Sequence, residues 1–124
     1  MIFLIPAIAL ATPVALTNTH QNDIACVAIL ATVAEKQRLG LSVPDIGDVQ
    51  SSGKIWAGLV GSRITEESGQ PRELVAVAMT EAAKAEFQRP SDAAAVQKCA
   101  MQMRTELANA QARDTPLPKP VTSK

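Results

Sequence analysis

The chain has 124 residues and a formal net charge of zero, with two cysteines, one histidine and no tyrosine. A chain of this length is expected to fold as one domain. Zero net charge offers no basic field for nucleic acid or anionic lipid, so the sequence predicts a protein that does not bind nucleic acid. Alanine supplies much of the 47% hydrophobic content, and aromatic residues make up only 2%. We therefore expect a thin core that benefits from a covalent cross-link.

Residues 1–16 form an uncharged apolar segment, MIFLIPAIALATPVAL, which Pro6 and Pro13 interrupt. A membrane-spanning helix needs about 20 predominantly apolar residues, and this segment is shorter. Its length is typical of the apolar region of a signal peptide, although the basic residues that usually precede that region are missing. The alternatives are an uncleaved membrane anchor and a buried helix of a cytosolic protein.

Ala9 and Ala11 form the A-x-A pattern of a signal peptide cleavage site. We therefore interpret residues 1–17 as a signal peptide or N-terminal hydrophobic segment. The mature protein is expected to begin between Thr12 and Asn18. It is then periplasmic or secreted and keeps no stable membrane span after processing.

A first helix is predicted to begin at Asn22 or Asp23, whose short side chains can cap a helix, and to end at about Leu39. Gly40 follows as a residue that readily adopts the left-handed conformation found after helices. Four apolar residues recur at helical spacing and are expected to face the core. They are Cys26, Ile29, Leu30 and Val33.

Residues 41–52 are predicted to form a loop because they contain Pro44, Gly47 and two adjacent serines. We expect three apolar side chains of this loop to pack against the helices, namely Val43, Ile46 and Val49. The segment 47–54 (GDVQSSGK) superficially matches a phosphate-binding loop. However, five residues rather than four separate its glycines, and Ile55 replaces the Ser or Thr that would bind magnesium. The sequence therefore predicts no nucleotide site there.

A second helix is predicted over residues 53–67. Gly58 and Gly61 each weaken it by about 1 kcal/mol relative to alanine. We expect these glycines to let a neighbouring helix backbone approach closely; the alternative is a flexible element. The expected core face consists of Ile55, Trp56, Leu59, Val60 and Ile64.

Pro71 suits the first turn of a third helix, which is predicted to end at about Gln88. Its expected core face is Leu74, Val75, Ala78, Met79 and Ala82. Ser91 is expected to cap a fourth helix that extends to about Ala112. The core face of that helix is predicted to be Val96, Cys99, Met103 and Leu107. Residues 113–124 carry alternating prolines and are predicted to form a disordered, extended tail.

These elements predict an all-α protein, a small four-helix domain over residues 18–112 that is orthogonal or bundle-like. Cys26 and Cys99 both lie on expected core faces, and packing of the first helix on the fourth would bring them together. In an oxidising compartment such a pair forms an inter-helix disulfide. The alternatives are two buried free thiols and, without a C-x-x-C motif to favour it, a redox-active thiol.

The sequence identifies no catalytic, cofactor-binding or metal-binding residue. His20 is a lone histidine beside the expected processing site, and we expect it to be a solvated linker residue rather than a ligand or base. Met101 and Met103 lie two residues apart in a helix and would point to nearly opposite sides. We therefore expect them, with Met79, to fill the core rather than to bind copper.

Paired carboxylates could act in glycosidic hydrolysis without a histidine. The candidates are Glu66, Glu67, Glu73, Glu81 and Glu86. Some of the chain's glutamates have a basic residue three positions later, and we expect two of these pairs to be surface ion pairs on a helix. These pairs are Glu35 with Arg38 and Glu81 with Lys84.

By elimination, we expect a non-enzymatic exported protein that interacts with another protein or with the cell envelope and needs no cofactor. The alternative is a periplasmic carrier of a metal or small ligand, and a carboxylate-dependent hydrolase is third. The sequence does not specify the partner or the oligomeric state.

Overall fold

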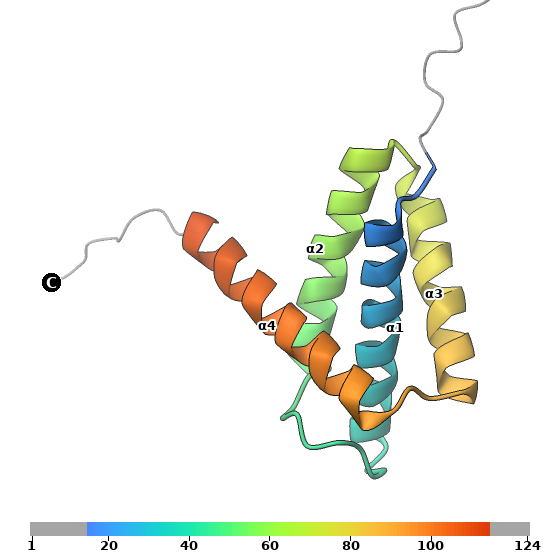
Figure 1. Cartoon of the computed structure of the whole chain (residues 1–124), viewed down its shortest axis with the longest axis vertical. Helices are drawn as coiled ribbons and strands as arrows, with labels where there is room; N and C mark the ends of the chain where they lie inside the picture. The colour runs from blue at the N-terminus through green and yellow to red at the C-terminus, as the bar shows by residue number, and fades with distance from the viewer. Residues whose placement is uncertain (1–14, 115–124) are drawn as a thin grey trace, which may run out of the picture.

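The computed structural model describes residues 15–114 and folds them into four helices without strands (Figure 1). The helices are α1 (Asn18–Arg38), α2 (Gln50–Ser68), α3 (Arg72–Gln88) and α4 (Ala93–Asp114). The predicted all-α, four-helix fold is therefore confirmed for this part of the chain. Residues 1–14 and 115–124 lie outside the described range, so the signal peptide and the proline-containing tail remain predictions.

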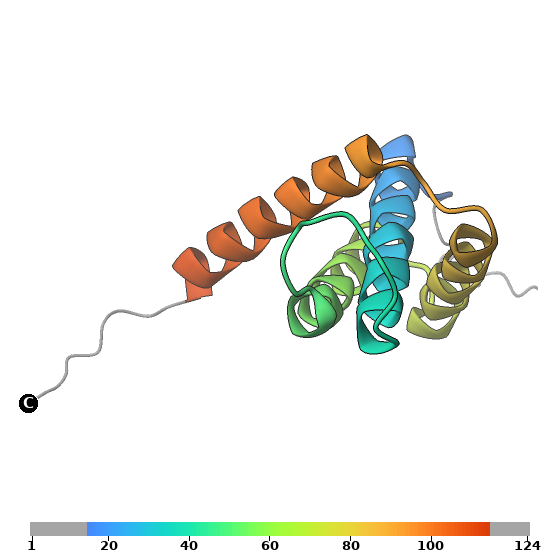
Figure 2. The ribbon, with the colours of Figure 1, turned by 90° about the horizontal axis from the view of Figure 1, so that it is seen from below.

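Helices α2, α1 and α3 lie side by side as a layer with α1 in the middle, and α4 crosses one face of that layer (Figures 1 and 2). Helix α1 packs against each of the other three helices. Figure 2 shows that α4 covers the layer from one side only and that its C-terminal half extends beyond α2. Two distinct surfaces result: a buried one under α4 and an opposite one that no described helix covers.

The core lies between α4 and the three-helix layer. Its largest fully buried side chain is Trp56 of α2, which is joined by Leu30 of α1 and Met103 of α4. Val49 and Ile46 of the loop before α2 are also buried, and Val43 packs against them, as the sequence predicts. All four residues predicted for the core face of α1 are buried as well.

Two residues predicted to face the core are instead exposed. Ile55 is 63% exposed and Leu74 is 56% exposed. Helices α2 and α3 form the edges of the layer, so each has neighbours on one side only and buries a narrower face than its apolar pattern suggests. The remaining predicted core positions of these two helices are buried or partly buried.

Helix α1 begins earlier than predicted because Thr17, and neither Asn22 nor Asp23, is its N-cap. Thr17 Oγ1 accepts a hydrogen bond from the His20 backbone N–H at 3.1 Å, and His20 Nδ1 accepts one from the Thr17 N–H at 3.3 Å. This reciprocal pair is a capping box with histidine in the place where glutamate or glutamine is usual. Asp23 consequently lies in the second turn of α1.

The predicted helix end at Gly40 is confirmed. Gly40 has a φ of 75°, a left-handed conformation that glycine adopts without steric cost. Its N–H bonds to the Gln37 carbonyl at 3.1 Å, and the Leu41 N–H bonds to the Lys36 carbonyl at 2.8 Å. This is the Schellman arrangement, which satisfies carbonyls left open at the end of a helix.

The cap of α4 differs from the prediction by one residue. Asp92 Oδ1 accepts a hydrogen bond from the Ala95 N–H at 2.8 Å, so Asp92 caps the helix. Ser91 instead donates its hydroxyl to Glu86 Oε1 at 3.0 Å and thereby closes the turn between α3 and α4. At α3, Pro71 directly precedes the first helical residue, Arg72.

The expected close helix approach at the α2 glycines is wrong. A Cβ atom built on Gly58 would meet no heavy atom within 4 Å, and one built on Gly61 would meet only the Met79 side chain, at 3.7 Å. Neither glycine therefore faces a neighbouring backbone. Gly58 is exposed and helical, which leaves no steric reason for glycine at that position.

We predict that Gly58→Ala stabilises the protein. Alanine is favoured over glycine in a helix interior by up to about 1 kcal/mol, and the added methyl group has free space around it. Urea unfolding should show a higher midpoint with an unchanged slope. A lower midpoint would contradict the prediction, because it would mean that the added methyl group clashes with a neighbouring atom.

Candidate functional site

The disulfide between Cys26 and Cys99 is present and joins α1 to α4. Its S–S distance is 2.05 Å and its Cα–Cα distance is 5.2 Å, and both residues are buried. The predicted inter-helix disulfide is therefore confirmed.

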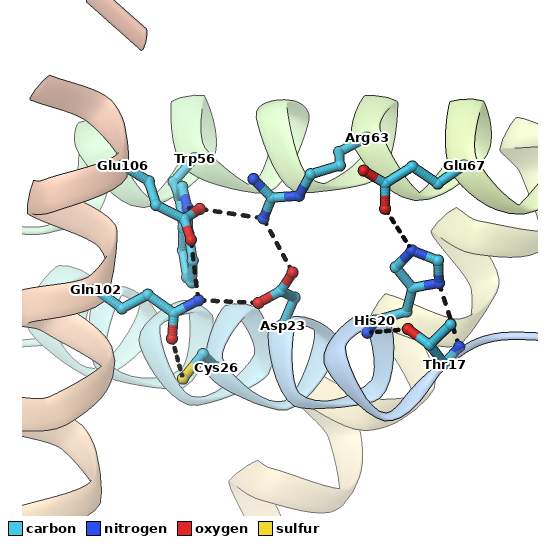
Figure 3. A network of polar contacts seen from close by, with 9 residues as sticks. All are labelled: Thr17, His20, Asp23, Cys26, Trp56, Arg63, Glu67, Gln102 and Glu106. Atoms are coloured by element: carbon cyan, nitrogen blue, oxygen red, sulfur yellow. Dashed lines mark hydrogen bonds and ion pairs between the residues drawn. The ribbon is translucent and has the colours of Figure 1, made fainter. Parts of the chain in front are cut away.

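A polar network connects α1, α2 and α4 beside this disulfide (Figure 3). Arg63 of α2 lies at its centre and donates to Asp23 Oδ2 at 2.9 Å and to Glu106 Oε1 at 3.1 Å. The side chain of Asp23 is only 5% exposed, whereas those of Arg63 and Glu106 are 29% and 26% exposed. The most deeply buried carboxylate of the network is thus paired with a partly solvated guanidinium.

Trp56 and Gln102 complete the network. Trp56 Nε1 donates to Glu106 Oε1 at 2.9 Å, and Gln102 Nε2 donates to Asp23 Oδ1 at 2.9 Å and to Glu106 Oε2 at 3.2 Å. All four carboxylate oxygens of Asp23 and Glu106 therefore accept a hydrogen bond. Gln102 Oε1 lies 3.7 Å from Cys26 Sγ, which is a contact rather than a hydrogen bond because a disulfide sulfur carries no proton.

The electrostatics of the network favour the charged forms. Burial works to raise the pKa of Glu106, but hydrogen bonds from Trp56, Arg63 and Gln102, together with the charge of Arg63, outweigh burial and hold this pKa below the ordinary 4.5. Burial works to lower the pKa of Arg63, but its bonds to Glu106 and Asp23 raise that pKa above its ordinary value. Glu106 and Arg63 are therefore both charged at neutral pH.

This pKa shift predicts an acid-dependent contribution to stability. Because the pKa of Glu106 is lowered on folding, its stabilising effect is present above about pH 4.5 and is lost as the pH falls through the lower, folded value. Glu106→Gln should therefore unfold at lower urea concentration than the wild type at about pH 7, and the difference should shrink towards about pH 3. A difference that stays constant with pH would show that the charge of Glu106 is not responsible.

The network can hold helices together, but its groups are poorly placed for proton transfer. Each carboxylate oxygen already accepts from a donor of the protein, and Arg63 stabilises the charged state. A general base needs a pKa near the working pH, and the pKa of Glu106 is instead held below its ordinary value. The arrangement therefore acts as a polar tie that fixes where α4 crosses α1 and α2.

The expectation that His20 is a solvated linker residue is wrong. His20 is 4% exposed and belongs to the first turn of α1. Its Nε2 lies 2.8 Å from Oε1 of Glu67, a residue of the last turn of α2 (Figure 3). Helix formation from Thr17 onward turns the ring inward, where it joins the ends of the two helices.

The methionines have the predicted opposite orientations, but the expectation that Met101 fills the core is wrong. Met101 is 64% exposed, whereas Met103 is 1% exposed and lies in the core. Met79 packs partly against the core from α3. Within residues 15–114 the structure contains no group of three or more His, Cys, Asp or Glu side chains arranged to hold a metal ion.

Both predicted surface ion pairs are present. Arg38 donates from Nε to Glu35 at 3.0 Å, and Lys84 Nζ lies 3.7 Å from Glu81. Among the other candidate glutamates, Glu86 accepts from Ser91, and Glu66, Glu67 and Glu73 are exposed. The five candidate carboxylates, Glu66, Glu67, Glu73, Glu81 and Glu86, all lie in α2 or α3. The network carboxylates Asp23 and Glu106 lie in α1 and α4.

The segment 47–54 forms the end of the loop and the first turn of α2. Its backbone is bound by α1, because Gln37 donates to the Gly47 carbonyl at 2.7 Å and accepts from the Val49 N–H at 3.0 Å. The loop is thus a structural connection that closes the interface between α1 and α2.

A groove of about 370 Å³ runs between the C-terminal half of α1 and the N-terminal half of α2. Four small apolar side chains line it, and so do charged groups of both helices. The lining residues are Val27, Ala31, Ala34, Glu35, Arg38, Gln50, Gly53, Lys54 and Ala57. None of them belongs to α4, so the groove opens away from the polar network.

Comparisons with models of protein families, with curated proteins and with solved structures find no match. Between residues 15 and 114, no helix is long and apolar enough to cross a membrane. The sequence did not identify the network residues Asp23, Arg63, Gln102 and Glu106 as functional or structural partners. A signal was present, because Asp23 lies three residues before Cys26 and Arg63 lies seven after Trp56, which places opposite charges on two buried helix faces.

Proposed function

We propose that this protein is an exported, non-enzymatic interaction module that binds a segment of another protein in the groove between α1 and α2. The observation that carries this proposal is the groove itself, whose apolar floor continues the edge of the core at Val27 and includes the exposed Ala31 but no residue of the polar network. An apolar helix of a partner can insert small side chains into such a groove, which is a common mode of peptide recognition.

The charges at the groove favour a partner segment with an acidic side chain. Glu35 and Arg38 neutralise one another in an ion pair. Lys54 is exposed and has no ion-pair partner among residues 15–114, so it leaves one positive charge at the edge of the groove. A carboxylate opposite Lys54 would add modest affinity and would orient the bound segment.

Binding of the partner is tested with two matched arginine variants. Ala31 lies exposed in the groove, and Ala108 lies exposed on α4, outside the groove. When each tagged variant is used to isolate partners from envelope extract, Ala31→Arg should lose the partner that the wild type retains, and Ala108→Arg should retain it. Equal loss in both variants, or in neither, contradicts binding at the groove.

A carrier of a small apolar ligand is the second candidate, because the groove volume of about 370 Å³ also suits such a molecule. Native mass spectrometry of the purified protein distinguishes the two. A bound species of small-molecule mass that Ala31→Arg abolishes would support the carrier.

The export part of the proposal predicts where the signal peptide is cleaved. Leu16 packs against the core and Thr17 caps α1, so a mature chain that keeps its fold must retain both. We expect cleavage after Ala11 and a mature N-terminus at Thr12. Intact mass measurement of material from the periplasm or medium checks this. Recovery of the complete chain from the cytosol would contradict export.

A further inference from the structure

The capping box at the start of α1 depends on the protonation state of His20. A ring nitrogen accepts a hydrogen bond only when it carries no proton. His20 Nδ1 accepts from the Thr17 N–H, so the proton of the neutral ring is on Nε2 and points to Glu67 Oε1. One tautomer thus satisfies both contacts.

Protonation of the ring preserves one of these contacts and removes the other. In the imidazolium form both nitrogens are donors. The Nε2–H bond to the Glu67 carboxylate then becomes an ion pair. Nδ1–H and the Thr17 N–H are then two donors that face each other, so the hydrogen bond between them is lost. Because the His20 side chain is only 5% exposed, the ring cannot turn into solvent without leaving Glu67.

We propose that His20 is a pH-sensitive cap: the neutral ring accepts the Thr17 N–H and completes the capping box, whereas the protonated ring stays bound to α2 and loses this hydrogen bond. The bond from the His20 N–H to Thr17 Oγ1 remains in both states. Histidine is the side chain that exchanges a proton between about pH 5 and 8. The device therefore couples pH to the capping of α1 at its first turn, independently of the proposed groove.

The charged groups around the ring are few. Glu67 of α2 is in direct contact. Asp23, three residues along α1, and Arg63, four residues before Glu67 on α2, are bonded to each other. Within residues 15–114, Glu67 is the acidic group that forms an ion pair with the protonated ring, and it holds the ring on α2.

The test compares hydrogen exchange of the Thr17 amide by NMR in the full chain and in His20→Gln. Glutamine is a usual capping-box residue, can donate to Glu67 and does not titrate in this range. The ratio of wild-type to variant exchange rates cancels the intrinsic pH dependence of exchange. It should rise about fivefold from pH 8 to pH 5, the change typical of losing one capping interaction. An unchanged ratio overturns the proposal.

Two further measurements make the result specific. The ring ¹⁵N shifts at pH 8 should show the Nε2–H tautomer, and finding the Nδ1–H tautomer overturns the proposal. In Glu67→Gln the acceptor oxygen remains. The acid-induced rise in the Thr17 exchange rate relative to His20→Gln should therefore persist, because it originates at Nδ1.

If His20→Gln does not fold, the Thr17 amide shift of the wild type must follow the same pH midpoint as the His20 ring. Different pH midpoints for the Thr17 amide shift and the His20 ring shifts then overturn the proposal.

Discussion

Replacing both cysteines, Cys26→Ala with Cys99→Ala, should destabilise the protein by about 2–5 kcal/mol, the range typical for losing a native disulfide in a small secreted domain. The bond closes a loop with a sequence separation of 73, and a loop of this length gives roughly 4 kcal/mol in the chain-entropy model. It also provides the covalent attachment of α4, which crosses the layer rather than packing along it. We expect the melting temperature to fall by at least about 8 °C.

The control for this prediction is reductant. Dithiothreitol added to the unfolded wild type before refolding should lower its melting temperature to that of the double variant, and the variant itself should not respond. A wild type with two titratable thiols and an unchanged melting temperature would contradict a stabilising disulfide.

Arg63→Met should have the second large effect. The substitution leaves Asp23, whose side chain is 5% exposed, without its cation. Removing one partner of a buried ion pair costs about 3–5 kcal/mol, and the partial exposure of Arg63 and Glu106 reduces the expected loss to about 2–3 kcal/mol. Urea unfolding followed by the fluorescence of Trp56, which donates to Glu106, measures both stability and the integrity of the network.

Arg38→Met is the matched control, because Arg38 forms an ion pair with Glu35 at the surface. The two side chains of that pair are 62% and 44% exposed and are screened by solvent, so its loss should leave the urea midpoint nearly unchanged. Similar losses in Arg38→Met and Arg63→Met would show that burial of the polar network contributes nothing specific.

The amino-acid sequence predicted the helices and the disulfide because these depend on local rules. The helices follow from signals that act within a few residues, such as apolar spacing, Pro71 and Gly40. The disulfide follows because the chain has only two cysteines, both on expected core faces, so only one pairing is possible. The start of α1 was missed because histidine replaces the glutamate or glutamine of a usual capping box.

The polar network could not be predicted in the same way. Apart from the bond between Gln102 and Glu106, its bonds join residues 40 to 79 positions apart, such as Arg63 with Asp23 and Gln102 with Asp23. Such pairs depend on how α1 packs against α2 and on how α4 crosses both, which no local pattern encodes. The exposure of Ile55 and Leu74 has the same origin, since only the layer arrangement decides how wide a face each edge helix buries.

Site-specific photo-crosslinking at position 31 tests the proposed interaction most directly. A photoreactive residue at Ala31 lies in the groove, and the same residue at Ala108 lies exposed on α4, outside the groove. Irradiation of cells that export the protein should give a discrete protein adduct from position 31 and none from position 108. An adduct from position 108 alone, or no adduct from position 31 in correctly exported, disulfide-bonded protein, would contradict binding of a partner in the groove between α1 and α2.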